Sequence, residues 1–219
     1  MSDKIIKNNQ VTINGKIVSD FAFNHEVFGE KFYTANLSSI RKSGATDIIP
    51  VMVSDRLVDV KEDWEGQYVK IEGQFRSYSK HAENENHLIL SVFAREFEKI
   101  ETLPFSDDEN HIFLDGFVCK EPIYRKTPLG REIADLLIAA NRPYGKSDYI
   151  PCICWGRNAR FAGNLGVGTH ITLEGRIQSR EYKKRISDTE TETRVAFEVS
   201  VSEINVVEKT EDNENEEEN

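Results

Sequence analysis

Residues 9–15 read NQVTING, and residues 110–116 read NHIFLDG. These two strings lie 101 residues apart. At an offset of 102, one residue more, residues 67–73 (QYVKIEG) match residues 169–175 (THITLEG). Single residues between these strings align at the original offset: Gly29 with Gly130, Arg41 with Arg142, and Pro50 with Pro151. The closing segments LILSVFAREFEKIE and VAFEVSVSEINVVE also align. The chain is therefore predicted to contain two copies of one module.

The repeat divides the 219 residues into four segments. The first module is predicted to span residues 1–102, the linker LPFSDDE residues 103–109, and the second module residues 110–207. Residues 208–219 form a tail with one basic and seven acidic residues. Because such a segment has nothing apolar to bury, it is expected to be disordered.

Both modules are predicted to consist of β-strands. In the second module, five segments are rich in β-branched and aromatic residues: 112–118, 133–141, 149–155, 171–177 and 195–207. Residues 156–168, between the third and fourth of these, fit a short amphipathic helix that Gly166 and Gly168 would end. Residues 55–65 occupy the same place in the first module. The predicted class is all-β, with two tandem five-stranded OB-fold barrels that each have a helix between strands 3 and 4; a short β-sandwich has the same strand count.

Net charge differs between the modules. The whole chain carries −10, whereas residues 1–109 carry −6 (13 basic and 19 acidic residues) and residues 110–207 carry +2 (14 basic and 12 acidic residues). Only the local field at a binding surface acts on a partner. The second module is therefore the better candidate for binding an anionic partner such as a nucleic acid.

The segment YIPCICW at residues 149–155 is expected to present aromatic side chains to solvent. Side chains alternate along a strand, so Ile150, Cys152 and Cys154 suit a barrel interior. The outward side would then carry Tyr149, Pro151, Ile153 and Trp155. A lone aromatic on a strand is more often a core residue, and a basic hairpin is more often a solvated edge. The convergence of both features in one module favours single-stranded nucleic acid, because bases stack on rings for ~1–3 kcal/mol each while cations follow the phosphates.

Residues 110–208 resemble the bacterial single-stranded-DNA-binding protein family. The resemblance is carried by four strings: PIYRKTPLG (122–130), AANR (139–142), WGRNA (155–159), and Gly168 with ITLEGRI (171–177). It implies an OB-fold that coats single-stranded DNA with little sequence specificity, in replication, recombination or repair.

The resemblance also implies a set of binding residues. The aromatic positions on which the family stacks bases correspond here to Tyr144, Tyr149, Trp155 and Tyr182. The family's hairpin arginine, which lies near the phosphates, corresponds to Arg125. Further basic residues are candidates through their location: Arg142, Arg157, Arg176, Arg180, Lys183 and Lys184.

The first module departs from this pattern. The residues that match Tyr149, Trp155 and Arg125 in the internal alignment are Ile48, Ser54 and Asn24. This module is therefore expected to bind DNA weakly or not at all, and to serve the assembly. Family members commonly assemble four OB-folds as a homotetramer, so two OB-folds per chain imply a homodimer.

The acidic tail departs from the family in one respect. The family's tail ends in a hydrophobic tip that docks replication and repair proteins, whereas the tail here stops at Glu218-Asn219 without one. Three roles are open: docking of such proteins, solvation, and occupation of the basic groove in competition with DNA.

No catalytic or cofactor site is predicted. The five histidines are scattered, Cys152 and Cys154 lack a second pair of zinc ligands, and no phosphate-binding loop is present. We expect no enzymatic activity, no cofactor, no metal and no membrane span. Three cysteines and the lack of a signal-like stretch favour the cytoplasm, in association with the nucleoid. The alternative function is an OB-fold scaffold that binds proteins in replication or mobile-element transfer.

Overall fold

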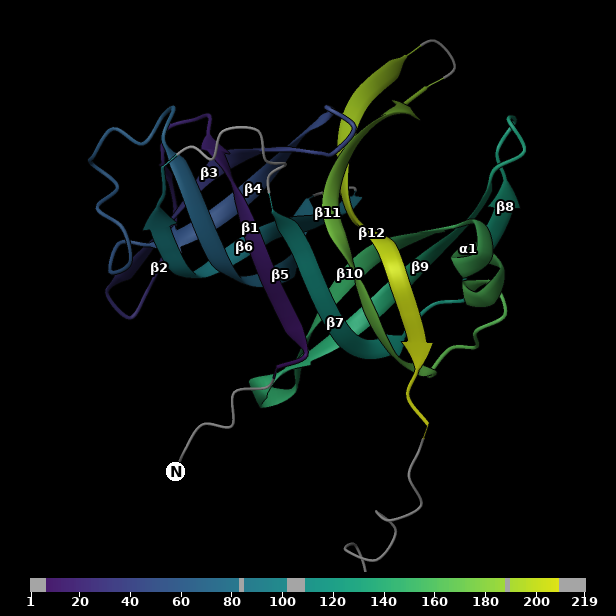
Figure 1. Ribbon diagram of the computed structural model, residues 1–219. Coiled ribbons are helices and arrows are strands. Elements are labelled where there is room, and N and C mark those ends of the chain that lie inside the picture. Colours follow the sequence, from purple (N-terminus) through teal and green to yellow (C-terminus); the bar gives the residue numbers. More distant parts are fainter. Residues whose placement is uncertain (1–6, 83–84, 102–108, 188–189, 209–219) are drawn as a thin grey trace, which may run out of the picture.

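The computed structural model describes residues 7–82, 85–101, 109–187 and 190–208 (Figure 1). These residues form an all-β architecture, with one sheet of 12 strands, one short α-helix and one 3-10 turn. Apart from Glu109 and Glu208, the predicted linker and the predicted tail lie outside the described residues. Within the described ranges, no helix has the length and apolar character needed to cross a membrane.

The first half of the chain supplies six strands. They are β1 (Asn9–Ile17), β2 (Ala22–Val27), β3 (Glu30–Ile40), β4 (Thr46–Ser54), β5 (Tyr68–Ala82) and β6 (Glu85–Lys99). β1 pairs with both β3 and β5, β3 pairs with β4, β4 runs parallel to β6, and β6 pairs with β5. Five strands therefore form a closed circuit of backbone hydrogen bonds, and β2 extends it as a hairpin on β3.

The second half repeats this circuit. Its elements are β7 (Asn110–Val118), β8 (Ile123–Lys126), β9 (Glu132–Arg142), the 3-10 turn η1 (Pro143–Gly145), β10 (Lys146–Trp155), α1 (Gly156–Ala162), β11 (His170–Arg185) and β12 (Thr191–Val206). β7 pairs with β9 and β11, β9 with β10, β10 with β12 in parallel, and β12 with β11. All five strands predicted here are confirmed. β8 was not predicted, because its four residues are all exposed and leave no alternation to detect.

The predicted helix of the second half is present but shorter than expected. α1 follows β10 and buries Ala159 and Ala162 against the core. The predicted stops at Gly166 and Gly168 are wrong, because the helix ends already at Ala162. The N–H of Gly163 donates to the C=O of Ala159 (2.9 Å), and turns follow.

The helix predicted at residues 55–65 of the first half is wrong, because this segment consists of turns. Asp59 organises them: its side chain accepts the N–H of Lys61 (3.1 Å), and its C=O accepts the indole N–H of Trp64 (2.9 Å). Local hydrogen bonds from an aspartate offer the backbone an alternative to helix. The Trp64 ring packs edge-on against Phe97, with centroids 5.2 Å apart, so its role is packing.

The two halves meet around a local two-fold axis. β1 and β7 pair in antiparallel fashion, and Val11 lies opposite Ile112, its own equivalent in the repeat. The pairs on either side are symmetric about this point. The axis therefore passes between Val11 and Ile112, where β1 and β7 run side by side near the centre of the molecule (Figure 1).

Side-chain hydrogen bonds repeat the symmetry. The Asn9 amide donates to the C=O of Phe75 (2.7 Å), and its oxygen accepts the N–H of Phe75 (2.9 Å). Asn110 makes the same two bonds with Ile177 (2.8 and 2.9 Å). Phe75 on β5 is thus the structural equivalent of Ile177 on β11, and the offset of these strands is 102.

Each half also inserts one buried carboxylate into the other. Asp47 on β4 accepts the N–H of Ser179 on β11 (2.7 Å), and Asp148 on β10 accepts the N–H of Ser77 on β5 (2.7 Å). Asp47 and Asp148 are equivalent residues of the repeat, and both are buried. Burial raises the pKa of Asp148, while the Ser77 N–H and Arg142 oppose this shift.

The interior of the second half contains two thiols. Cys152 and Cys154 are buried with Ile150 on the inner side of β10, as predicted, whereas Cys119 is half-buried. Burial raises the pKa of Cys154 to about 12 and places the pKa of Cys152 well above its ordinary value. Because the thiolate is the reactive form, both thiols are inert in the folded protein.

We therefore expect a thiol reagent such as a maleimide to modify at most Cys119 in the native protein at pH 8. Cys152 and Cys154 should react only after denaturation, and mass spectrometry of the intact protein and its peptides would count and locate the adducts. Rapid native labelling of either buried thiol would show that β10 does not pack as described.

Candidate nucleic-acid interface

The outer side of β10 carries two exposed aromatic side chains. Tyr149 lies in the first half of this strand and Trp155 at its end, and they are 45 % and 41 % exposed. The strand alternation predicted both. Ile153 was predicted to point outward as well, but it is only 3 % exposed. It lies between Asp135 of β9 and Ser200 of β12, so strands on both sides cover it.

Tyr144 lies on the turn that leads into β10. It adopts φ +65°, the left-handed region that is uncommon for non-glycine residues, and its side chain is 95 % exposed. The flanking Pro143 and Gly145 complete the turn η1. The backbone thus holds an aromatic ring in solvent beside the edge of the β10 face.

Tyr182 lies on the hairpin of β11 and β12, which projects away from the rest of the sheet (Figure 1). It sits opposite Arg194 and is 37 % exposed. Lys183 and Lys184 follow it, opposite Thr193 and Glu192. This arm therefore combines one ring with adjacent cations, as predicted.

Arg125 lies on the same face as Trp155. The register places Arg125 opposite Ile133, and places Trp155 opposite the same Ile133 from the other side. The two residues are thus two strands apart, or about 10 Å. The Arg125 guanidinium donates two hydrogen bonds to one oxygen of Asp135 (Nε 3.0 Å and Nη2 2.7 Å).

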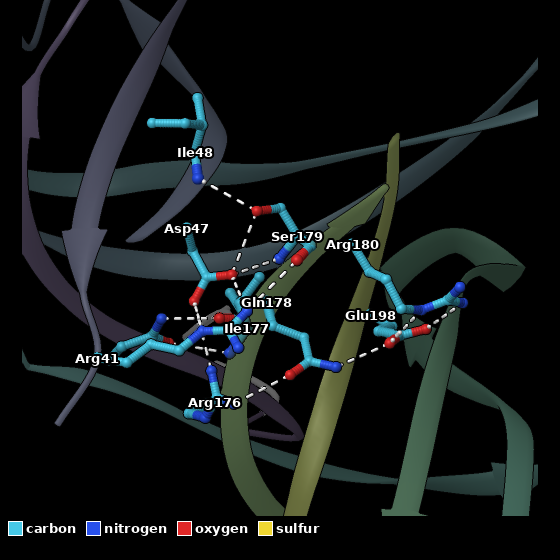
Figure 2. Close-up of polar contacts among 10 residues, drawn as sticks. Arg41, Asp47, Ile48, Arg176, Ile177, Gln178, Ser179, Arg180 and Glu198 are labelled. Atoms are coloured by element: carbon cyan, nitrogen blue, oxygen red, sulfur yellow. Dashed lines mark hydrogen bonds and ion pairs between the residues drawn. The ribbon is translucent and has the colours of Figure 1, made fainter. Parts of the chain in front are cut away.

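An extended polar network occupies the outer side of β11 and β12 (Figure 2). Arg180 donates to both carboxylate oxygens of Glu198 at 3.2 Å, and the hydrogen bond to Glu198 raises the pKa of Arg180. The Gln178 amide also donates to Glu198 (2.7 Å) and accepts from Arg176 (3.0 Å). These arginines were predicted as phosphate contacts, and here they are held by neighbouring side chains.

The network continues into the first half through Asp47. Its carboxylate accepts two hydrogen bonds from Arg41 (Nε 2.6 Å and Nη2 2.5 Å) and one from Arg176 (3.3 Å). Figure 2 shows these groups converging between β4 and β11. Burial lowers the pKa of Arg176, with Arg41 acting in the same direction. Arg176 therefore contributes to the junction between the halves.

Two further predicted arginines lie near the aromatic residues. Arg142 directly precedes η1, and its Nε lies 3.2 Å from a carboxylate oxygen of Asp148. Arg157 is exposed on α1, just after Trp155. Sequence reasoning missed Asp47, Asp148 and Glu198 as the carboxylates that engage the predicted arginines. Asp47 is distant from Arg176 in the sequence, and the other two contacts depend on how neighbouring strands pair.

In the first half, the positions equivalent to Tyr149 and Trp155 carry no aromatic side chains, as expected. Ile48 is exposed at the place of Tyr149, and Ser54 is buried at the place of Trp155. Asn24 at the place of Arg125 is exposed. Among the described residues, no cluster of three or more histidine, cysteine or acidic side chains is arranged to hold a metal ion.

Relatives of known sequence match the second half. Residues 109–207 match the single-strand binding protein family. "Single-stranded DNA-binding protein 2" of Listeria innocua is 35 % identical over 92 residues, which cover 37 % of this chain and 58 % of that protein. "Single-stranded DNA-binding protein A" of Bacillus subtilis is 32 % identical over 83 residues, which cover 35 % and 48 %. The chain thus spans about half the length of the curated relatives it matches.

Solved structures resemble both halves. The wild-type single-stranded DNA binding protein from Thermus aquaticus has a TM-score of 0.71 at 19 % identity, over 92 % of this chain and 94 % of that chain. A deletion mutant of the same protein has a TM-score of 0.72 over 94 % and 97 %. At this identity the likeness is one of fold. The similarity in sequence to the single-strand binding protein family extends over residues 109–207, which is less than half of the chain.

Proposed function

We propose that this protein binds and coats single-stranded DNA without catalysis and with little sequence specificity, in replication, recombination or repair. The observation that carries the proposal is the pair of exposed rings, Tyr149 and Trp155, on one face of β10 in the segment that matches the family. Bases stack on such rings whatever their identity. Tyr144 and Tyr182 extend this set from the adjoining turn and hairpin.

The phosphates would be followed by cations around this face. Arg125, Arg157, Lys183 and Lys184 are the best placed, because they lie on the β8 hairpin, on α1 and on the β11–β12 arm. Arg125 also pairs with a carboxylate, but the Asp135 side chain is 35 % exposed, whereas Arg142 and Arg180 would have to share the buried carboxylates of Asp148 and Glu198 with phosphate. Arg176 is held at the junction with Asp47. We therefore rank these three as weaker contacts.

The proposed organisation has two tandem OB-folds at residues 1–102 and 110–207, the linker between them, and an acidic tail at 208–219. The two closed circuits of five strands and the likeness in fold to the Thermus aquaticus protein support it. Two chains would form a homodimer with four OB-folds. The molecule would act at the nucleoid in the cytoplasm, with the tail available to replication or repair proteins.

Replacing Trp155 with alanine is expected to weaken binding of an oligomer of ~35 deoxythymidines by ~1–3 kcal/mol, because one stacking ring is lost. Since the variant also lacks the tryptophan whose fluorescence would report stacking, affinity is measured from the anisotropy of a labelled oligomer. The matched control is Phe161→Ala, which removes a ring of similar exposure (43 %) from α1 and should leave affinity unchanged. Equal affinity of both variants and the parent would remove Trp155 from the site, and a parent that does not bind at low salt would overturn the proposed function.

A further inference from the structure

The outer face of the first half carries a pair of arginines around one aromatic ring. Phe93 on β6 lies beneath the guanidinium of Arg76, whose central carbon is 3.9 Å from the ring centroid. The Arg95 guanidinium approaches the same ring at 5.8 Å. Gln74 places its side-chain oxygen between them, accepting from Arg76 (2.8 Å) and from Arg95 (3.5 Å). The two cations are thus held side by side.

A row of rings continues from this pair across the face. Phe93 is followed by Phe32 on β3, with centroids 5.7 Å apart. Phe32 in turn stacks on His25 of β2, at 4.9 Å and 13° between planes. The first half lacks rings at the places predicted from the second half, but it carries these others on the same face. Their places in the second half hold aliphatic, hydroxyl or basic residues, so the repeat alignment did not reveal them.

The equivalence of Phe75 and Ile177 shows why charge accumulates here. Arg76 follows Phe75, so it is the equivalent of Gln178 in the second half. On the paired strand, Gln178 lies opposite Glu198, whereas Arg76 lies opposite the uncharged Ser91. The carboxylate that neutralises the second half's face is absent from the equivalent place in the first half. The net charges of the two modules, −6 and +2, had predicted instead that positive charge would be in excess on the second half.

Within the described residues, neither Arg76 nor Arg95 has a carboxylate within ion-pair distance. Burial lowers the pKa of Arg76 to about 10, and the nearby charges of Arg95 and Arg142 act in the same direction. Asp148 alone opposes them. Arg76 and Arg142 thus both act on the buried carboxylate of Asp148, Arg95 acts on Arg76, and an anion placed among the three guanidinium groups would relieve their repulsion.

The cluster adjoins the aromatic face of the second half. Arg142 directly precedes the turn that carries Tyr144. The N–H of Tyr149 donates to the hydroxyl of Ser77, the residue after Arg76 (2.7 Å). The strands that carry Arg76 and Tyr149, β5 and β10, are therefore in direct contact at the junction of the two halves.

We propose that Arg76 and Arg95 bind the phosphates of single-stranded DNA as it passes from the second half onto the first, with the ring row of Phe93, Phe32 and His25 beneath the adjoining bases. Phosphate contacts of this kind position a strand without reading its sequence. Arginine planes and aromatic rings both accept stacked bases. The first half then extends the binding path, although its net charge is −6.

Because this inference rests on the proposed function, the test compares two lengths of DNA. A deoxythymidine oligomer of ~8 nucleotides fits one OB-fold, and one of ~35 nucleotides spans both. For the variant Arg76→Gln with Arg95→Gln, the slope of log affinity against log salt with the long oligomer should fall in magnitude by about 1.4, which is ~0.7 for each phosphate contact. That change corresponds to roughly 25-fold weaker binding at 0.1 M salt and about fourfold at 0.4 M. Binding of the short oligomer should be unchanged.

The matched control is Arg56→Gln with Lys61→Gln, which removes the same charge from exposed positions of the first half. If the long oligomer loses affinity equally with both double variants, a general field effect replaces the proposed site. If the short oligomer is weakened as much as the long one, the arginines belong to the second half's site and the extended path is wrong. If the parent protein and the Arg76/Arg95 variant bind the long oligomer with the same affinity and salt dependence, this inference is wrong and the proposed function stands.

Discussion

Replacing Asp47 with alanine is expected to lower the free energy of unfolding by about 3–5 kcal/mol, because removing one partner of a buried ion pair leaves charge uncompensated. The Asp47 side chain is fully buried and accepts hydrogen bonds from Arg41, Arg176 and the backbone of Ser179. The alanine variant would leave two partly buried guanidinium groups facing each other and one backbone N–H without its acceptor. Since Asp47 and Arg41 belong to the first half and Arg176 and Ser179 to β11 of the second, the loss would also loosen the contact between the halves.

Urea denaturation followed by circular dichroism would measure this loss. Asp63→Ala, at an exposed position in the β4–β5 connection, is the control and should change stability by less than about 0.5 kcal/mol. Asp47→Asn keeps an acceptor for the Ser179 N–H but removes the charge, so it should fall between the two. A loss below ~1 kcal/mol for Asp47→Ala would show that solvent reaches the junction and compensates the two arginines.

Gly175→Ala is expected to cost about 3 kcal/mol, because the chain packs too closely there for a side chain. Gly175 lies at the bulge where β11 bends over β12, and an added Cβ would run into the backbone carbonyl of Ser200. A backbone carbonyl cannot swing aside as the end of a flexible side chain can. The variant would have to shift the strand crossing that closes the second circuit.

Gly166→Ala is the matched control for this prediction. Gly166 has no atom within 4 Å of a built Cβ and no positive φ, so alanine should be neutral or slightly stabilising through the unfolded state. The two variants differ by the same methyl group, and their urea midpoints isolate the effect of the close approach. Equal midpoints would mean that the β11 bulge relaxes at little cost.

Much of the architecture could be predicted because its signals are local. The alternation in residues 149–155 predicted the burial of Ile150, Cys152 and Cys154 and the exposure of Tyr149 and Trp155, although it failed at Ile153. The repeat predicted that Asn9 and Asn110 stand at equivalent places. Residues 55–65 failed as a helix prediction, because apolar spacing does not reveal the hydrogen bonds by which Asp59 stabilises turns.

The electrostatics of the faces could not be predicted in the same way. Asp47 meets Arg176 across more than a hundred residues, and Glu198 faces Arg180 only through strand register. Counting charges for each half therefore assigned the excess of positive charge to the second half. The structure instead pairs many of those arginines with carboxylates, whereas Arg76 and Arg95 in the acidic half have no such partner among the residues that the structure describes.

Joining the two halves in one chain removes a constraint on the surfaces around the Val11–Ile112 axis. In a two-fold dimer of identical subunits, the two surfaces related by the axis carry the same residues. A polymer that crosses such a dimer therefore forms the same complex in either direction. Here the axis relates Ser91 to Glu198, and Ile48 to Tyr149. A DNA strand crossing both faces would meet unlike surfaces in an order set by its 5′-to-3′ polarity. A fused, divergent pair can therefore sense the direction of a strand, which a symmetric pair cannot.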